Sequence, residues 1–152
     1  MLERDQAYRT QWILSRQLHH EETQYDIALR LRADSIDSLN QVEIRQILKE
    51  HGFPKKTEVG TSACEAAWII IQHAPLDVQK EYLPMLERAA TEGNIQAALV
   101  AALHDRIDVR EGRPQKYGTQ RNRNGICPLL NKKMVNQWRK EVGLPPLDEY
   151  SK

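Results

Sequence analysis

The hydrophobic pattern of the chain centres on one stretch, Ala63–Ala74, which reads Ala-Cys-Glu-Ala-Ala-Trp-Ile-Ile-Ile-Gln-His-Ala. Apart from Glu65, this stretch is apolar on every side until it reaches Gln72 and His73. A helix that is apolar all round belongs in the interior of a domain rather than on its surface. The pattern therefore predicts a buried helix that carries a Gln–His pair to, or close to, the interior.

Helical periodicity also appears on both sides of this buried helix. Capping residues and glycines mark most of the expected ends, and Pro84 should kink or divide the helix that contains it. Residues His19–Ser38 lack a clean helical period, so we expect a helix there that frays into a loop. The expected helices are Glu3–Arg16, part of His19–Ser38, Ser38 or Asn40 to about His51, Thr61 or Ser62 to Ala74, Asp77–Thr91, Ile95–Glu111 and Lys132–Val142.

A different pattern follows Gly112. Asn124-Gly125 is the strongest short-range signal for a β-hairpin, and we interpret the flanking segments Gln115–Arg121 and Ile126–Leu130 as its strands. No internal repeat is obvious, so a solenoid is not expected. The predicted fold is mainly α, a compact bundle of about six helices with one small β-hairpin near residues 115–130. It forms a single domain, residues 1–152, with an extended C-terminal tail at residues 144–152.

Composition and charge narrow the classes of function. The 152 residues include 22 Lys and Arg and 21 Asp and Glu, a net charge of +1, whereas general nucleic-acid binders usually carry a marked basic excess. No apolar run approaches the roughly 18 residues of a membrane span, and the first residues lack the apolar core of a signal peptide. Cys64 and Cys127 lack the paired spacing of a zinc site. We therefore expect a cytoplasmic protein with two reduced thiols, no metal and no cofactor, and neither a membrane nor a nucleic acid as its partner.

His73 is the best candidate for chemistry, because an unpaired polar group in the interior costs about 1–3 kcal/mol. Asp77 lies four residues further on, across the break at Pro75, and could orient the imidazole. A carboxylate that holds one ring nitrogen leaves the other free as a base or an acid. The alternative is a hydrogen-bonded packing histidine without a catalytic role. No His-x-x-x-His, Glu-x-x-His or Cys-x-x-Cys spacing supports a metal site.

Arg106 is the second unusual residue, because it extends the apolar stripe of the predicted Ile95–Glu111 helix. An arginine in that position needs an anion or several carbonyl groups to offset its desolvation. Asp105 points about 100° away around the helix, so it is not the natural partner. The alternatives to ligand binding are an internal salt bridge and a side chain that reaches solvent. The candidate anions are Asp5, Glu65, Asp77, the carboxylates of the tail and a ligand.

The third feature is the polar segment Gln115-Lys116-Tyr117-Gly118-Thr119-Gln120 on the first predicted strand. Strand alternation would send Gln115, Tyr117 and Thr119 to one face, where an amide, a phenol and a hydroxyl suit specific hydrogen bonding. Gly118 would let another chain or a ligand approach the backbone closely. The alternative is an ordinary hairpin whose tyrosine packs on the helices.

Basic residues cluster around this segment. They form either a solvated rim beside a turn or a surface that attracts an anionic substrate or a phosphate backbone. The cluster consists of Arg110, Arg113, Lys116, Arg121 and Arg123.

Five short motifs occur in order along nearly the whole chain. They are Asp5-Gln6 with Arg9, Gln72-His73, Asp105-Arg106, Gln115 with Tyr117-Gly118-Thr119-Gln120, and Val142-Gly143-Leu144 through Tyr150. Together they resemble a bacterial family of domains of unknown function, a resemblance that supports the choice of candidate residues and implies no established activity. The chain departs from that family at Phe53, where a tryptophan is expected, and at Pro128–Lys132, which replaces an acidic stretch.

Two hypotheses from different classes follow. The first is a small enzyme-like domain that binds an anionic small molecule or peptide and uses His73, oriented by Asp77, for acid–base chemistry. The second is a non-catalytic protein-interaction module, such as an immunity or adaptor protein, whose basic hairpin and Leu144–Tyr150 tail contact the partner. A cavity lined by both His73 and Arg106 would favour the enzyme. Its substrate-binding residues would be Arg106, Asp105, Gln115, Tyr117, Thr119, Gln120, Asp5 and Arg9.

Overall fold

The structure, a computed structural model, describes residues 2–18 and 22–147, with side chains for residues 6–17 and 22–147. Most of these residues are helical, which confirms the predicted mainly α fold with one small hairpin. Strands β1 (Arg121–Asn122) and β2 (Gly125–Ile126) pair antiparallel, with Arg121 opposite Ile126 and Asn122 opposite Gly125. The helices are α1 (Leu2–Leu18), α2 (Gln24–His51), α3 (Lys56–Val59), α4 (Thr61–His73), α5 (Leu76–Thr91), α6 (Ala97–Arg110) and α7 (Val135–Glu141).

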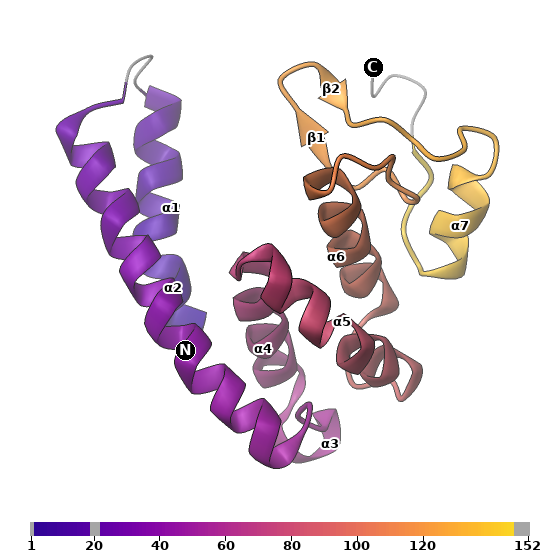
Figure 1. Cartoon of the computed structure of the whole chain (residues 1–152), viewed down its shortest axis with the longest axis horizontal. Coiled ribbons are helices and arrows are strands. Elements are labelled where there is room, and N and C mark those ends of the chain that lie inside the picture. Colours follow the sequence, from indigo (N-terminus) through magenta and orange to yellow (C-terminus); the bar gives the residue numbers. More distant parts are fainter. Residues whose placement is uncertain (1, 19–21, 148–152) are drawn as a thin grey trace.

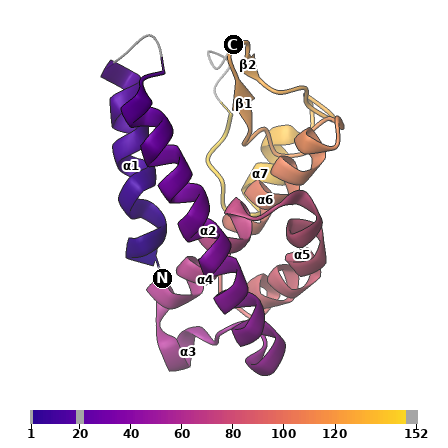
Figure 2. The ribbon, with the colours of Figure 1, turned by 60° about the vertical axis from the view of Figure 1, so that its left-hand side comes forward.

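Helices α4 and α5 lie in the middle of the molecule, between two groups of elements (Figures 1 and 2). Helices α1 and α2 pack side by side in an arm, and α6, α7 and the hairpin make up the opposite side. Helix α4 contacts α1, α2, α3 and α5, while α5 packs on α6. Helix α2 has 28 residues, which corresponds to a length of about 42 Å. Across the described residues, no helix combines the length and the hydropathy needed to cross a bilayer.

Helix α4 lies at the centre of the hydrophobic core, as its apolar sequence predicts. Ile70 and Ile71 are each 1% exposed, and they belong to the same buried cluster as Leu86 of α5 and Leu103 of α6. The helix begins directly after Gly60, which has a φ of 81° and no side chain to offer as a cap. The predicted side-chain cap is therefore absent. Because α4 is packed on several sides, it fixes the positions of its two ends relative to the other helices.

Residues Gln24–His51 form one continuous helix, so the predicted fraying and the predicted second start are wrong. Thr23 and Asp26 make a capping box, in which the Thr23 hydroxyl accepts from Asp26 N (3.1 Å) and the Asp26 carboxylate accepts from Thr23 N (2.8 Å). Such a box satisfies two of the free N–H groups at a helix start. Ser38 does not cap a new helix, because its hydroxyl donates to the Asp34 carbonyl within α2 (3.0 Å).

The helical period of α2 is hidden because some polar and apolar residues occupy unexpected faces. Asp26 and Asn40 are fully buried, whereas Ile27, Leu31 and Leu39 are exposed. A search for apolar residues at helical spacing assumes that the apolar side chains are the buried ones. That assumption fails along this arm, and the sequence pattern therefore looks irregular.

Polar side chains join α1 to α2. Arg9 forms an ion pair with Asp37, and Asp26 accepts a hydrogen bond from Ser15 and is attracted by Arg16. Polar contacts of this kind can fix the register of two helices more sharply than apolar contacts do. The arm is thus held in part by specific pairs, which also determine where Arg9 lies.

Three smaller features also differ from the sequence-based expectation. Helix α5 continues through Pro84 from Leu76 to Thr91, so the predicted division does not occur. The short helix α3 lies in a segment expected to be a loop. The hairpin is confirmed, but its strands are only two residues long, and residues 115–120 form an irregular loop instead of a strand. The side-chain hydrogen bonds of that loop explain its irregular path, as described below.

Replacing Asp26 with Asn should remove a pH-dependent part of the stability. Hydrogen bonds from Ser15 and Thr23 lower the pKa of the Asp26 carboxyl from its ordinary 3.8 to about 2. Because the folded-state pKa is the lower one, the stabilisation is present above about pH 4 and is lost as the pH falls towards 2. Urea denaturation of both proteins should show a difference in free energy of unfolding that is constant from pH 7 to 5 and shrinks below pH 4. Asp34→Asn, also on α2, is the control for the loss of one charge, and a difference independent of pH would contradict the assignment.

Candidate functional site

The carboxylate of Asp105 holds the segment Gln115–Gln120, here called the Asp105 loop. Asp105 lies on α6 and is 0% exposed. Its Oδ1 accepts from the backbone N of Lys116 and of Tyr117 (2.9 Å each). Its Oδ2 accepts from Thr119 N (2.9 Å) and from the Thr119 hydroxyl (2.8 Å). Both oxygens are therefore used within the chain, and the loop curls around them instead of extending as a strand.

Gln115 anchors the same loop from its other end. It is 0% exposed, and its side-chain Nε2 donates to the carbonyls of Gln120 and Cys127 (2.9 Å each). Its Oε1 accepts from Gln120 N (2.8 Å). The Gln120 side chain in turn donates to the carbonyl of Ala102 on α6 (3.3 Å). These bonds tie the loop both to the strand that follows it and to the helix that precedes it.

Arg139 of α7 completes the support of the Asp105 loop. It is 8% exposed and donates to the carbonyls of Tyr117 (2.7 Å) and Pro145 (2.6 Å). Burial lowers the pKa of its guanidinium, while Asp105 acts in the opposite direction. Gly118 has a φ of +68°, and an added Cβ would lie 3.1 Å from Leu129, so a glycine is needed here. The close approach expected at this glycine is thus made by the chain's own side chains.

These contacts change the role of several predicted substrate-binding residues. Asp105, Gln115 and Thr119 have their polar groups bonded inside the chain, so we assign them to the support of the loop. The Gln120 amide is also engaged, and the Tyr117 ring lies under the Lys116 ammonium (5.1 Å to the ring centroid). The sequence pattern drew attention to these polar residues, but it could not distinguish an internal hydrogen-bond network from a ligand site.

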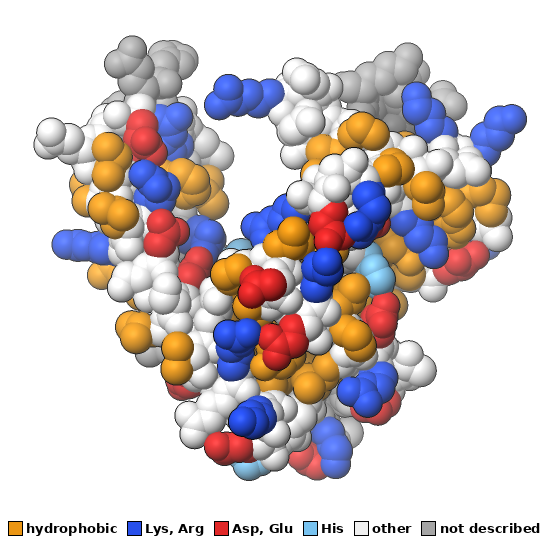
Figure 3. All heavy atoms as spheres, viewed as in Figure 1, with side chains coloured by type: hydrophobic (Ala, Val, Ile, Leu, Met, Phe, Trp, Pro, Cys, Tyr) orange, Lys and Arg blue, Asp and Glu red, His pale blue; other side chains and the backbone are white. Residues whose placement is uncertain are grey.

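A cleft separates the arm of α1 and α2 from the opposite side of the molecule. Figure 3 shows this hollow, with Lys or Arg side chains and a His side chain gathered at its inner end. Two observations show that residues of α1, α4 and α6 lie close to one another. Arg9 of α1 lies close enough to Arg106 of α6 to act on its charge. Arg110, one turn after Arg106, donates to the carbonyl of Ala74 directly after α4 (3.2 Å).

Arg106 is the least satisfied of these cations. Its side chain is half-buried, and its Nε is buried without a hydrogen-bond partner among the described residues. Burial lowers the pKa of the guanidinium, and the nearby charges of Arg110 and Arg9 lower it further. Removal of a cation from water is unfavourable unless an anion compensates. Of the candidate anions, Glu65 and Asp77 form no ion pair with Arg106, whereas the side chains of Asp5 and of residues 148–152 lie outside the described ones.

His73 is the last residue of α4 and is half-buried. It directly precedes Ala74, whose carbonyl accepts from Arg110, so the end of α4 and Arg110 lie close together. Asp77 lies exposed in the first turn of α5, where its side chain forms no hydrogen bond or ion pair with any described residue. The predicted His73–Asp77 pair is therefore not formed, because α5 already begins at Leu76 and carries Asp77 towards solvent.

The predicted basic cluster does not form a single free surface. Arg113 pairs with Asp108 and Glu111, and Lys116 stacks on the ring of Trp138 (5.3 Å to the centroid). Arg110 belongs instead to the cleft, which its spacing of four residues from Arg106 could have indicated. The sequence did not indicate that Arg139 is buried, because its burial depends on the contact with Pro145 in the tail. Within the described part of the chain, no group of three His, Cys, Asp or Glu is placed to hold a metal ion.

Comparison with known proteins identifies a family but no function. A family model described as a family of unknown function, DUF6624, matches residues 1–152. No curated protein and no solved structure matches the chain. The match over the whole chain agrees with the resemblance inferred from the motifs, and the geometry of the site remains the basis for any functional argument.

Replacing Asp105 with Ala should destabilise the protein strongly, because three backbone N–H groups and one hydroxyl lose their acceptor. We expect the free energy of unfolding to fall by about 3–5 kcal/mol, the range for an uncompensated buried polar network. Thr119→Val removes one of the four bonds and should lower it by about 1 kcal/mol. Urea denaturation followed by circular dichroism measures both changes. Equal losses in the two variants would show that the carboxylate does not hold the loop.

Proposed function

We propose that this chain, which belongs to the DUF6624 family of unknown function, binds a small anionic ligand in the cleft and moves protons through His73. The observation that carries the proposal is the state of Arg106. This guanidinium is half-buried and its Nε has no partner among the described residues. The charges of described residues that act on it are those of two other arginines. A bound anion would offset the desolvation of Arg106 and the repulsion among the three cations.

The charges around the cleft favour a doubly charged ligand. Among the described residues, Arg9, Arg106 and Arg110 contribute three positive charges, and Asp37, which pairs with Arg9, contributes one negative charge, so these four side chains carry an excess of two. Guanidinium groups bind carboxylate and phosphate through paired N–H donors of fixed geometry. A phosphate monoester or a dicarboxylate would supply this charge.

The proposed role of His73 rests on its position beside these arginines. Its helix ends one residue before the carbonyl that accepts from Arg110. Imidazole exchanges a proton near neutral pH, which makes it the usual general acid or base of enzymes. An anion held by the arginines would place its reacting group near this ring, and the arginines would stabilise negative charge that develops during the proton transfer.

A non-catalytic protein-interaction module is the second candidate function. Of nine exposed large hydrophobic side chains among the described residues, seven lie on α1 and α2, so this surface is favourable for association. The seven are Ile13, Leu14, Tyr25, Ile27, Leu31, Leu39 and Val42. An interaction module would bind its partner outside the cleft and would not need Arg106 for binding. The proposed enzyme does need Arg106, because this residue would bind the anion. The tail beyond Leu147, which the sequence suggested as a partner surface, lies outside the described residues.

Inorganic phosphate should stabilise the protein through Arg106. If the dissociation constant is about 1 mM, then 20 mM phosphate stabilises the folded state by about 1.8 kcal/mol, which raises Tm by roughly 4–7 °C for a chain of this size. Arg106→Gln should abolish that shift. Arg121→Gln, on the exposed hairpin, is the matched control and should retain it. Differential scanning calorimetry in phosphate and in sodium chloride of equal ionic strength gives the comparison, and an equal shift in all three proteins would refute anion binding at Arg106.

Phosphate should also change the NMR signals of His73. A bound anion alters both the electric field at a nearby imidazole and its protonation, so the ring resonances of His73 should move as phosphate is added. His104 pairs with Glu87 on the outer surface (2.7 Å), and its ring resonances should stay in place. His73→Gln identifies the relevant signals. If Tm rises through Arg106 while the His73 signals do not move, then the anion binds without the imidazole and the proton-transfer role is wrong.

A further inference from the structure

A second hollow lies at the opposite end of α4 from His73. It has a volume of about 260 Å³ and is lined by Lys56, Thr61, Glu65, Asn94, Ile95 and Gln96. Helix α4 has 13 residues, so its two ends are separated by about 18 Å along the helix axis. This pocket is therefore distinct from the cleft, and nothing in the function proposed above depends on it.

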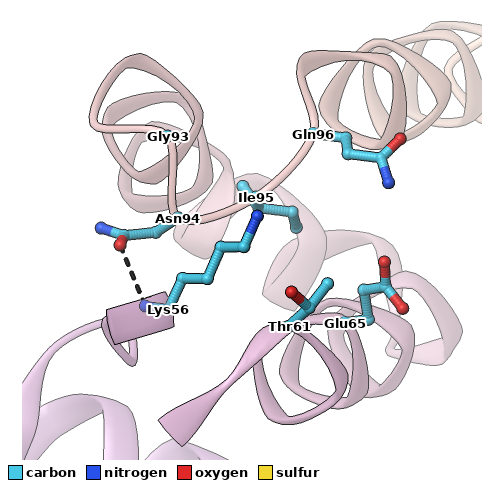
Figure 4. Close-up of a pocket in the computed structure, with 7 residues that line it drawn as sticks. All are labelled: Lys56, Thr61, Glu65, Gly93, Asn94, Ile95 and Gln96. Atoms are coloured by element: carbon cyan, nitrogen blue, oxygen red, sulfur yellow. Dashed lines mark hydrogen bonds between the residues drawn. The ribbon is translucent and has the colours of Figure 1, made fainter. Parts of the chain in front are cut away.

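The walls of the pocket are held in place by hydrogen bonds. The side-chain carbonyl of Asn94 accepts from the backbone N of Lys56 (3.1 Å), and this bond joins α3 to the connection between α5 and α6 (Figure 4). The backbone N of Asn94 donates to the Ala89 carbonyl (2.8 Å). Ile95 is 6% exposed and belongs to the main hydrophobic core. The pocket thus has a fixed frame and an apolar residue in its lining.

Two opposite charges line this pocket without neutralising each other. Figure 4 shows the Lys56 side chain extending past Ile95, while Glu65 and Gln96 lie on the other side of Thr61. The side chains of Lys56 and Glu65 form no hydrogen bond or ion pair with any described residue. Both nevertheless act on the buried Cys64 thiol: burial raises its pKa, Lys56 lowers it and Glu65 raises it. A cation and an anion on two sides of a small space complement a ligand that carries both signs.

The start of α4 adds to the positive end of the pocket. Gly60 precedes the helix, and no side chain caps the first-turn N–H groups near Thr61. Free N–H groups at a helix start favour a negative group, because they and the helix dipole point towards it. Taken with Lys56 and the Thr61 hydroxyl, they provide donors for a carboxylate. Glu65 and the side-chain carbonyl of Gln96 provide acceptors for an ammonium group.

We propose that this pocket binds a free amino acid. Its carboxylate would contact Lys56 and Thr61, its ammonium group would contact Glu65 and Gln96, and its side chain would pack on Ile95. The volume lies just below the range of about 300–1,000 Å³ typical of pockets for drug-sized ligands, so a nucleotide is too large and an amino acid is a suitable size. The opposite charges favour a zwitterion over a simple anion or cation.

Calorimetric titration of the full chain with L-alanine, L-leucine and L-glutamine tests the proposal. The N-acetyl form of each amino acid removes the positive charge, and the amide form removes the negative charge. We expect at least one free amino acid to bind with a dissociation constant of about 1 mM or below, and each of its blocked forms to bind at least about tenfold more weakly. Absence of binding by all three free amino acids, or equal binding by a free and a blocked form, would overturn the proposal.

Single substitutions then locate the site. Lys56→Gln and Glu65→Gln should each weaken binding of the free amino acid at least about tenfold, because each removes one charge-assisted contact. Lys55→Gln is the matched control, since Lys55 is adjacent, exposed and paired with Glu58 (3.2 Å) outside the pocket. Melting temperatures verify that each variant is folded. Binding that both pocket variants retain would show that the amino acid binds elsewhere, whereas a change in Arg106 should leave this titration unaffected.

Discussion

A charged group that folding removes from water must find its partners inside the protein or in a ligand, and two adjacent residues of α6 meet this constraint in opposite ways. Asp105 is fully buried, and both of its oxygens accept bonds from the loop that follows the helix. Arg106 is half-buried and retains an Nε without a partner among the described residues. The first residue therefore explains the shape of the C-terminal part of the chain. The second explains why the cleft beside it is suited to an anion.

The sequence predicts those parts of the fold in which burial follows hydrophobicity. Helix α4 is apolar on nearly all sides and lies in the core, and Asn124-Gly125 forms the expected turn of the hairpin. Helix α2 was misjudged because Asp26 and Asn40 are inside while Leu31 and Leu39 are outside. A pattern of apolar spacing carries no information about buried polar pairs between helices, and such pairs depend on which helices meet.

The sequence predicted that several candidate residues occupy unusual environments, but it did not predict the contacts that they make. Arg106 stands out because it extends an apolar stripe, and the structure keeps it half-buried beside other cations. Asp105 and Gln115 were also predicted to be unusual, yet their hydrogen bonds are made to other groups of the same chain. A sequence shows that a polar residue is in an unusual place, but only the coordinates show whether its donors and acceptors are already used. Arg110 and Arg139 gained their importance from partners that are distant along the chain.

The two proposed sites lie at the two ends of α4, and the packing of that helix argues that they bind independently. Ile70 and Ile71 are almost fully buried in the cluster that also contains Leu86 and Leu103. A helix packed in this way cannot shift without disturbing side chains in α5 and α6, and close-packed interiors resist small displacements. Coupling between sites requires an element with two alternative arrangements. The middle of α4 is closely packed, so the helix positions Arg110, through Ala74, at one end and Glu65 towards the other.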